Sequence, residues 1–386
     1  MNYSLSDRFS GLYDARRIYK SIVVGPTEAV LQAPAGSLFR GGPRWPQFGD
    51  EVESRHCRGI TPRPIDDEPL SNDPAVSTIA EGVWCGPVAR HYGHMIADFG
   101  MRIAQSALLS GNTPLLFSIP QLFRGKHQQY VPSFFWSILD VYDIPRSRIV
   151  LIDSPVTVDT LTVYPQSERL WGGPPSSEHL NFIGQIGSPE KTTQDIDVLY
   201  VSRSKHLAGG IAGEAYVDDV MMNAGATVTW PELLPVREQL NLYRRAKKIV
   251  FSEGSAIHTL QLGGALNAEV DILCRRSNSE IARASVQPRV TELRYVDCVK
   301  QNIYGVRLSG HDNPSKGITL LDQQRFKEEL EKLSPSASNA WSGQTYQQAA
   351  DADVKKWFDL RMAKPKKHPD EIRVLTERMR DAGISI

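Results

Sequence analysis

The sequence is poor in cysteine, has no long apolar run and carries no excess charge of either sign. Four cysteines occur among 386 residues, widely separated and without a CxxC pair, which argues against a disulfide framework or a structural zinc site. No apolar run approaches the roughly 18 residues that a membrane-spanning helix needs. The first 20 residues also lack the apolar segment of a signal peptide. We therefore expect a cytoplasmic protein without a transmembrane segment.

The balance of charge and the length limit the class of protein further. Lys plus Arg equals Asp plus Glu at 44 each, which argues against a basic surface for nucleic acid. Apolar residues make up 41% of the chain, enough for substantial cores. At this length two domains plus a tail are the natural expectation.

Strands and helices alternate in the sequence pattern. In the first half, apolar strands are predicted at 113–120 and 147–153 with a helix at 134–143 between them. Residues 25–75, rich in Pro, Gly and charge, are predicted to be irregular loops with one or two strands. The second half alternates more regularly, and this rhythm predicts an open, doubly wound parallel sheet. Its expected elements are strands at 197–204, 226–230, 248–252 and 269–274, and helices at 213–225, 236–247 and 254–264.

Two turns of this second sheet have the composition of a phosphate site. The strand at 248–252 ends in Ser252, Glu253, Gly254, Ser255 and Ala256 and opens directly into a helix. A helix start at that edge of a sheet offers free N–H groups and a positive dipole to an anion. Neither a Walker loop nor a GxGxxG motif is present, and an ordinary strand–helix turn is the alternative interpretation.

The second turn follows the strand at 197–204 at the same edge of the sheet. It contains Ser202, Arg203 and Lys205, and the two cations are suited to clamping a diphosphate. A solvated basic loop is the alternative interpretation. Together the two turns predict diphosphate recognition.

A helix predicted at 91–105 carries a narrow polar stripe. At helical spacing its polar residues share one face, and nearly all the other positions are apolar. The pattern predicts a buried helix turned toward a crevice, with His94 and Asp98 four residues apart and able to touch. A buried ion-pair row that merely pins the helix is the alternative. The stripe consists of His91, His94, Asp98, Arg102 and Gln105.

The order of these motifs resembles glycosyltransferase family 61, a group of capsular-polysaccharide-type transferases. The matching pieces are the Tyr92–Arg102 segment with His94 and Asp98, the Ser202–Ser204 strand end, Glu214, Pro231–Glu232, Glu238–Gln239, Ala246 and Ser252–Ala256. Glu253 stands where many members have His, and Ser255 where many have Ala. The resemblance covers roughly residues 80–275.

The resemblance implies a mixed α/β fold of two Rossmann-like domains facing a central cleft, the GT-B architecture, with a helical C-terminal tail. The expected boundaries are 1–180 for the acceptor-side domain, 181–310 for the nucleotide-sugar-binding domain and 311–386 for the tail. It also implies an inverting reaction that takes a sugar from a nucleoside-diphosphate donor, UDP-linked in many members, to a glycan or other hydroxyl acceptor. No metal cofactor is expected, and no Asp-x-Asp motif stands at a convincing strand end.

The resemblance and the two polar features together suggest roles for individual residues. Asp98 or His94 is the expected base, Asp98 being the slightly better candidate for direct contact, and Arg102 completes the predicted catalytic group. The expected donor-binding residues are Ser202, Arg203, Lys205, Glu232, Glu253, Gly254, Ser255 and Ala256. Within this set Glu232 would hold the ribose, and Glu253 would cap the helix or reach sugar hydroxyls.

Two other classes of function remain open at this level. His91, His94 and Asp98 have the ligand types of a two-His-one-carboxylate metal enzyme, although Arg102 in the same stripe would place a cation beside the metal. The chain could also be a non-catalytic protein that binds a nucleotide or glycan.

Overall fold

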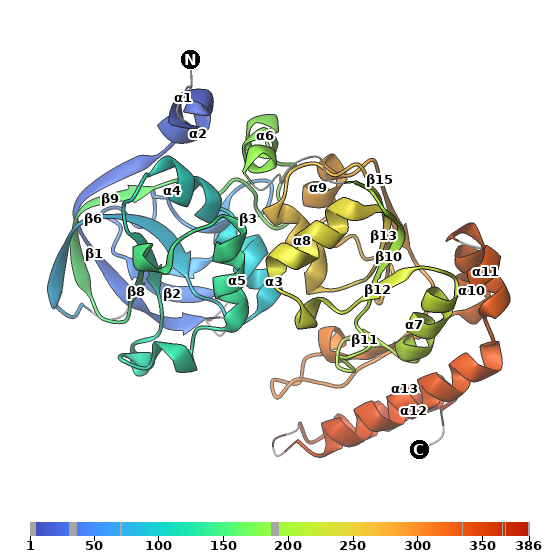
Figure 1. Cartoon of the computed structure of the whole chain (residues 1–386). Coiled ribbons are helices and arrows are strands. Elements are labelled where there is room, and N and C mark those ends of the chain that lie inside the picture. The colour runs from blue at the N-terminus through green and yellow to red at the C-terminus, as the bar shows by residue number, and fades with distance from the viewer. Residues whose placement is uncertain are drawn as a thin grey trace.

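The computed structural model describes residues 5–30, 37–69, 72–186, 193–333, 335–364, 366 and 368–384. Figure 1 shows two α/β units side by side, with the C-terminal helices beyond the second unit. Within the described residues, no helix is both long and apolar enough to cross a membrane.

The first unit is built on a seven-stranded sheet of order β5-β2-β1-β9-β6-β7-β8. Strands β9, β6, β7 and β8 are parallel, whereas β1 pairs antiparallel with both β9 and β2. The sheet comprises β1 (Arg17–Val30), β2 (Phe39–Pro43), β5 (Asp66–Asp67), β6 (Ser77–Pro87), β7 (Leu115–Ser118), β8 (Ile149–Ile152) and β9 (Val156–Val163).

The parallel part of this sheet agrees with the sequence-based expectation. The strands predicted at 113–120 and 147–153 are β7 and β8, with helix α5 (Ser133–Val141) between them. The antiparallel part was not predicted. It comes partly from 25–75, where the Pro and Gly content indicated mostly loops. Other helices of the unit are α1 (Leu5–Arg8), α2 (Ser10–Asp14), α3 (Tyr92–His94), α4 (Ile103–Leu109) and α6 (Ser177–Gln185).

The second unit has a fully parallel five-stranded sheet of order β12-β10-β13-β14-β15. Because β12 lies on one side of β10 and β13 on the other, the winding direction reverses between β10 and β13. This reversal is the topological switch point at which ligands bind in doubly wound sheets. The elements are β10 (Ile196–Val201), α7 (Glu214–Asn223), β12 (Thr227–Thr229), α8 (Val236–Arg245), β13 (Ala246–Ser252), the 3-10 helix η6 (Ser255–Leu262), β14 (Glu269–Leu273), α9 (Arg283–Val286) and β15 (Glu292–Val296).

The C-terminal helices pack on this second unit. A small sheet of order β11-β17-β16 precedes them, so the helical part begins at Gln323 rather than at 311. Tyr346 connects the C-terminal helices to this small sheet, because its hydroxyl accepts a 3.0 Å hydrogen bond from Leu321 N–H. The elements are β11 (Gly210–Ile211), β16 (Val299–Ile303), β17 (Ile318–Leu321), α10 (Gln323–Leu333), α11 (Pro335–Ala340), α12 (Gly343–Met362) and α13 (Glu371–Asp381).

The two α/β units share one continuous hydrophobic core. Phe135 and Phe182 of the first unit and Leu240 and Phe251 of the second belong to the same buried cluster. Helix α5 lies against α8 across the junction, where Ser137 Oγ accepts a 2.7 Å hydrogen bond from Val236 N–H. The domain boundaries expected after residues 180 and 310 remain predictions. Clusters of buried hydrophobic residues continue across both positions.

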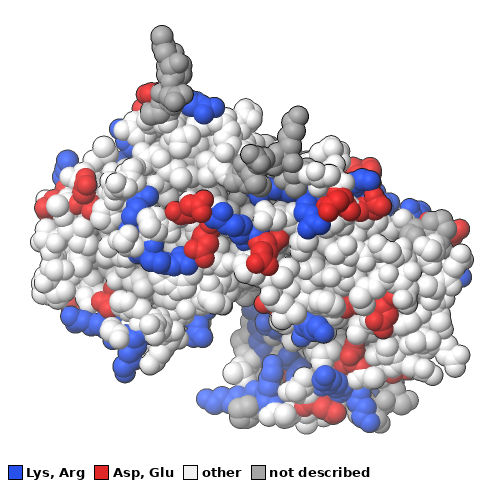
Figure 2. Space-filling view, in the orientation of Figure 1, with Lys and Arg blue, Asp and Glu red and all other residues white. Residues whose placement is uncertain are grey.

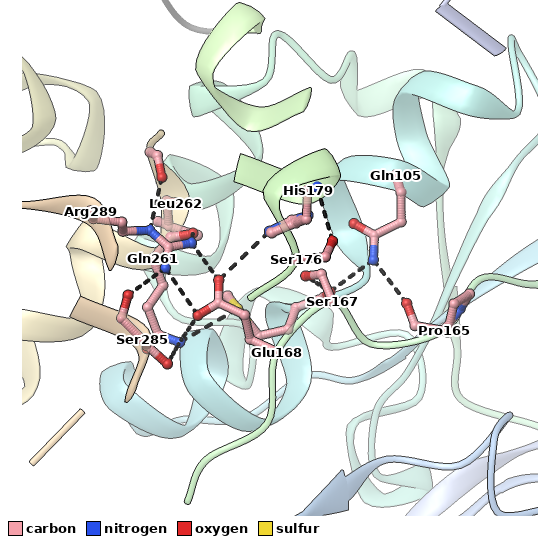
Figure 3. Close-up of polar contacts among 12 residues, drawn as sticks. Gln105, Pro165, Ser167, Glu168, Ser176, His179, Gln261, Leu262, Ser285 and Arg289 are labelled. Atoms are coloured by element: carbon pink, nitrogen blue, oxygen red, sulfur yellow. Dashed lines mark hydrogen bonds and ion pairs between the residues drawn. The ribbon is translucent and has the colours of Figure 1, made fainter. Parts of the chain in front are cut away.

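A buried ion pair also joins the units, as Figure 3 shows. The guanidinium of Arg289 donates to the carboxylate of Glu168, and neither side chain is exposed. Gln261 Nε2 adds a 3.2 Å hydrogen bond to Glu168. Burial raises the pKa of Glu168, but Arg289 and His179 outweigh it and lower this pKa to about 2. Removing either partner alone would leave a buried charge, at a cost of about 3–5 kcal/mol.

Candidate active site

A cleft of about 760 Å³ opens between the two units. Figure 2 shows the surface hollowed between them, with Lys and Arg side chains gathered at the bottom of the view, where the C-terminal part of the chain borders the hollow. Residues from both units line it, including Arg90, His91, Tyr92 and Phe134 from the first and Arg203, His206, Glu232, Ser255, Ala256 and Lys316 from the second. Four of the predicted donor-binding residues, Arg203, Glu232, Ser255 and Ala256, therefore face this one space.

Arg203 and Gly254 meet at the switch point of the second sheet. Arg203 follows β10 and Gly254 follows β13, and these strands are hydrogen-bonded neighbours. A Cβ atom at position 254 would collide with the guanidinium of Arg203, so only glycine lets this side chain lie across the turn. The sequence correctly placed the two turns together, and η6 begins there with backbone N–H groups that lack helical partners.

A buried carboxylate supports the Arg203 turn from below. Glu214 Oε1 accepts hydrogen bonds from Arg203 N–H at 2.9 Å and from the Tyr200 hydroxyl at 3.0 Å. Burial is the main cause that raises the pKa of Glu214 to about 7. Glu214 thus fixes the backbone that carries Arg203 and does not line the cleft itself.

Two residues of the predicted clamp do not line the cleft. Ser202 is buried, and its Oγ accepts a 3.0 Å hydrogen bond from Ser204 N–H. The ammonium of Lys205 lies 4.9 Å from the centre of the Trp230 ring, so a cation–π contact holds it beside the turn. Lys205 therefore does not line the cleft beside Arg203, and a clamp formed by the two cations stays a prediction.

Glu253 is also placed differently from the prediction. Its side chain is fully buried and forms an ion pair with Arg276, and its Oε2 accepts a 2.9 Å hydrogen bond from Arg275 N–H. Arg276 and the Ser279 hydroxyl engage the other carboxylate oxygen. Glu253 therefore neither caps η6 nor reaches toward a sugar, because the segment that follows β14 takes up both of its oxygens.

On the first unit, His94, Asp98 and Arg58 form a compact polar group. Asp98 Oδ2 lies 2.6 Å from His94 Nδ1, and Arg58 donates to both carboxylate oxygens at 2.6 Å. The side chain of Asp98 is completely buried, whereas that of His94 is 31% exposed. Burial raises the pKa of Asp98, but the hydrogen bonds from Arg58 and His94 outweigh it and the pKa is lowered. Asp98 is therefore ionised and orients the imidazole.

The polar stripe expected along 91–105 is broken in the structure. A π-helical segment, η1 (Met95–Gly100), follows α3 and shifts the phase of all later residues. Arg102 consequently points elsewhere, and its guanidinium donates to the carbonyl oxygens of Ser54 and Arg55 at 2.9 and 3.0 Å. It is 0% exposed. The prediction that Arg102 shares a face with His94 and Asp98 is wrong.

The helix that carries His94 packs directly on η6. Gly93 leaves room for this contact, since a Cβ atom there would lie 3.1 Å from Ser255 Oγ and 3.2 Å from a ring carbon of His258. The Tyr92 hydroxyl lies 2.7 Å from Thr259 Oγ1. His91 lines the cleft, and its ring centre is 4.6 Å from that of His94. The polar group on the first unit and the turn on the second are therefore neighbours.

Two further side chains of the site were not predicted from the sequence. Arg58 comes from β3 (Cys57–Arg58), in a segment read as loops, and Lys316 comes from the loop before β17. Trp171 accompanies Arg58: its ring centre lies 4.9 Å from the guanidinium, it is 70% exposed, and its φ is 58°. A non-glycine residue in the left-handed region is uncommon and tends to occur at functional turns.

The structure also bears on the metal-enzyme interpretation. Among the described residues, no group of three or more His, Cys, Asp or Glu side chains is placed to hold a metal ion. The Asp98 oxygens, which that interpretation needs as ligands, instead accept from the Arg58 guanidinium. The cation beside the carboxylate is thus Arg58 rather than Arg102.

The geometry describes an α/β protein with a cleft lined by His91 and Tyr92 on one side and by a phosphate-type turn on the other. The His94–Asp98 pair lies next to His91, at the edge of this lining. Residues 92–262 match the family model for Glycosyltransferase 61. This region contains His94, Asp98, Arg203 and the whole of η6. No curated protein matches the chain. The chain contains a glycosyltransferase family 61 domain and is a glycosyltransferase.

Proposed function

We propose that this glycosyltransferase moves a sugar from a nucleoside-diphosphate donor, with UDP favoured, to an acceptor hydroxyl in glycan or polysaccharide synthesis. The donor diphosphate would bind at the switch point of the second unit, and the acceptor would lie mainly on the first, as in a GT-B arrangement. The observation that carries this proposal is that Arg203, Ser255 and Ala256 from one unit line the same cleft as His91 and Tyr92 from the other.

The polar group on the first unit suits proton removal from the acceptor. With Nδ1 of His94 hydrogen-bonded to the ionised Asp98, Nε2 is the ring nitrogen left to accept a proton. Asp98 itself is completely buried, so we assign direct contact to His94 and the orienting role to Asp98. This order reverses the preference drawn from the sequence.

We propose an inverting displacement at this site. The acceptor oxygen attacks the anomeric carbon as its proton passes to His94 Nε2, and the bond from that carbon to the diphosphate oxygen breaks on the opposite face. The leaving diphosphate then carries the new negative charge. Arg203 and the backbone N–H groups at the start of η6 stabilise this charge. Cationic side chains in that position are the basis for proposing a metal-independent reaction.

An exposed aromatic ring lies beside the proposed base. Trp171 stacks on Arg58, whose guanidinium holds Asp98. A flat aromatic face next to the base would suit an acceptor sugar ring, because such rings present apolar C–H surfaces. We propose an acceptor position on this side of the first unit.

Release of a nucleoside diphosphate from a set of nucleotide sugars tests the proposed function. Wild-type protein with EDTA present should release nucleoside diphosphate from at least one donor, faster when the right acceptor is added. Binding without any release would favour the non-catalytic interpretation, and release that requires an added metal would favour a metal-dependent one.

A further inference from the structure

The loop between β16 and β17 carries a lysine into the proposed donor site. Lys316 is exposed and lines the same cleft as Arg203 and Ser255, although it lies well beyond residues 92–262 in the sequence. Within the described part of the chain, no carboxylate lies within 4.0 Å of its ammonium. A cation left without a partner in a cleft is available to an anionic ligand.

The charge of Lys316 affects His91, which lies on the opposite wall of the cleft. The pKa of His91 is lowered to about 4, mainly by burial and then by the nearby charges of His94 and Lys316. His91 belongs to the first unit and Lys316 to the second. The ammonium therefore lies toward the junction where a bound diphosphate and an acceptor would meet.

The backbone of the loop is fixed on both sides of Lys316. Arg275 Nη1 donates to Ser315 O at 3.3 Å, and Gly209 N–H donates to Gly317 O at 2.7 Å. Indole Nε1 of Trp357, on α12, donates to the carbonyl of Lys316 itself at 3.2 Å. The main chain is thus held in place while the side chain remains free.

These supports connect the loop to the Arg203 turn. Arg203 Nη2 donates to Gly209 O at 3.1 Å, and Gly209 is the residue whose N–H holds the loop. Arg275 is in turn anchored by Glu253, through its N–H at 2.9 Å and its Nε at 3.2 Å. The buried Glu253 therefore supports the loop of Lys316 through Arg275.

We infer that Lys316 completes the donor site by binding the diphosphate opposite Arg203, and that Trp357 of α12 and Arg275 position the loop that carries it. The inference rests on the proposed function. It gives the C-terminal helices a role in donor binding, and it replaces Lys205 as the second cation. Two cations on separate segments can both neutralise the charge that develops on the leaving group.

Calorimetric titration with nucleoside diphosphates, in EDTA and at low salt, tests this inference. UDP, GDP, CDP and ADP are titrated into wild-type protein, and the diphosphate that binds is then used with the variants. Lys316→Met should weaken its affinity about 10- to 100-fold, whereas Lys316→Arg should retain most of it. Lys300→Met, an exposed change on β16 outside the cleft lining, is the matched control and should have no effect.

The nucleoside monophosphate and a double variant separate charge recognition from a general structural effect. Lys316→Met should weaken the monophosphate less than the diphosphate. Trp357→Phe should weaken diphosphate binding in the wild-type background and have no further effect beside Lys316→Met, because the indole acts through the lysine. Unfolding temperatures check that each variant is folded.

The outcomes distinguish this inference from the proposed function. If wild type binds a diphosphate, Arg203→Ala weakens it and Lys316→Met does not, the inference is overturned while the proposed donor site stands. If wild type binds none of the four diphosphates, both are overturned.

Discussion

His94 Nδ1 lies 2.6 Å from Asp98 Oδ2, and the two side chains differ in exposure, 31% against none. The buried carboxylate also accepts hydrogen bonds from Nε and Nη2 of Arg58, one on each oxygen. A buried carboxylate that orients a partly exposed imidazole is an arrangement suited to general base catalysis. This difference in exposure is the basis for proposing that His94 takes the proton and that Asp98 orients it.

Asp98→Asn should lower the turnover number at least 100-fold and leave nucleotide affinity within about two-fold of wild type. Asparagine keeps the shape but cannot hold the Nδ1–H tautomer with a full negative charge. His94→Ala should lower turnover by about 10²- to 10⁴-fold. Steady-state rates and calorimetric titration measure both effects. Near-native turnover in either variant would show that the pair is not the base.

Arg58→Met should move the acid limb of the pH–rate profile to higher pH. In the wild type, burial raises the pKa of Asp98, but Arg58 and His94 lower it by more than burial raises it. Asp98 is therefore ionised throughout the neutral range. Without the guanidinium the burial effect is less opposed and the carboxyl protonates at higher pH. Rates measured from pH 5 to 9 test this, with Arg58→Lys as the charge-retaining control. An unmoved acid limb would contradict the assigned role of Arg58.

Gly93→Val should lower kcat/KM about 10- to 100-fold, because the helix that carries His94 and the start of η6 touch at this residue. A Cβ atom alone would lie 3.1 Å from Ser255 Oγ, and two more carbons must push the two walls of the cleft apart. Gly49→Ala is the control, since a Cβ atom there meets nothing within 4 Å. Unchanged kinetics in Gly93→Val would mean that this contact does not set the cleft geometry.

Glu214→Gln should stabilise the protein at pH 8 relative to wild type, and the difference should shrink as the pH falls toward 5. The pKa of Glu214 is raised from 4.5 to about 7 by burial, so between these values the folded state binds more protons than the unfolded state. Stability therefore falls as pH rises through this window, by an amount on the order of 2–3 kcal/mol. Unfolding temperatures at several pH values measure it. A pH-independent difference would contradict the raised pKa.

The second unit was predicted well from the sequence, for a physical reason. Its central strands β10, β13 and β14 are mostly buried and are therefore apolar runs bounded by turn residues. Each of the seven expected elements between 197 and 274 is present, and Gly225 has the left-handed φ of 88° expected at a helix end. The strands before Arg203 and Gly254 were expected to end at the same edge of the sheet, so the closeness of these two residues was also predicted correctly.

The first unit and the details of the site could be predicted less well from the sequence. A π-helical turn leaves no trace in residue periodicity, so Arg102 was assigned to the wrong face. Arg58 and Lys316 reach the site from a two-residue strand and a loop, where no spacing rule applies. Ser202, Lys205 and Glu253 are residue types that often bind ligands. In the structure, however, their polar groups contact other residues of the protein.

Donor binding in the cleft is the central claim, and calorimetric titration of UDP into wild type and Arg203→Ala tests it most directly. Arg373→Ala on α13, whose side chain is 61% exposed, is the matched control. The expected result is saturable UDP binding that is weakened at least 10-fold in Arg203→Ala and unchanged in the control. Binding of equal affinity in all three proteins would contradict the donor site proposed here.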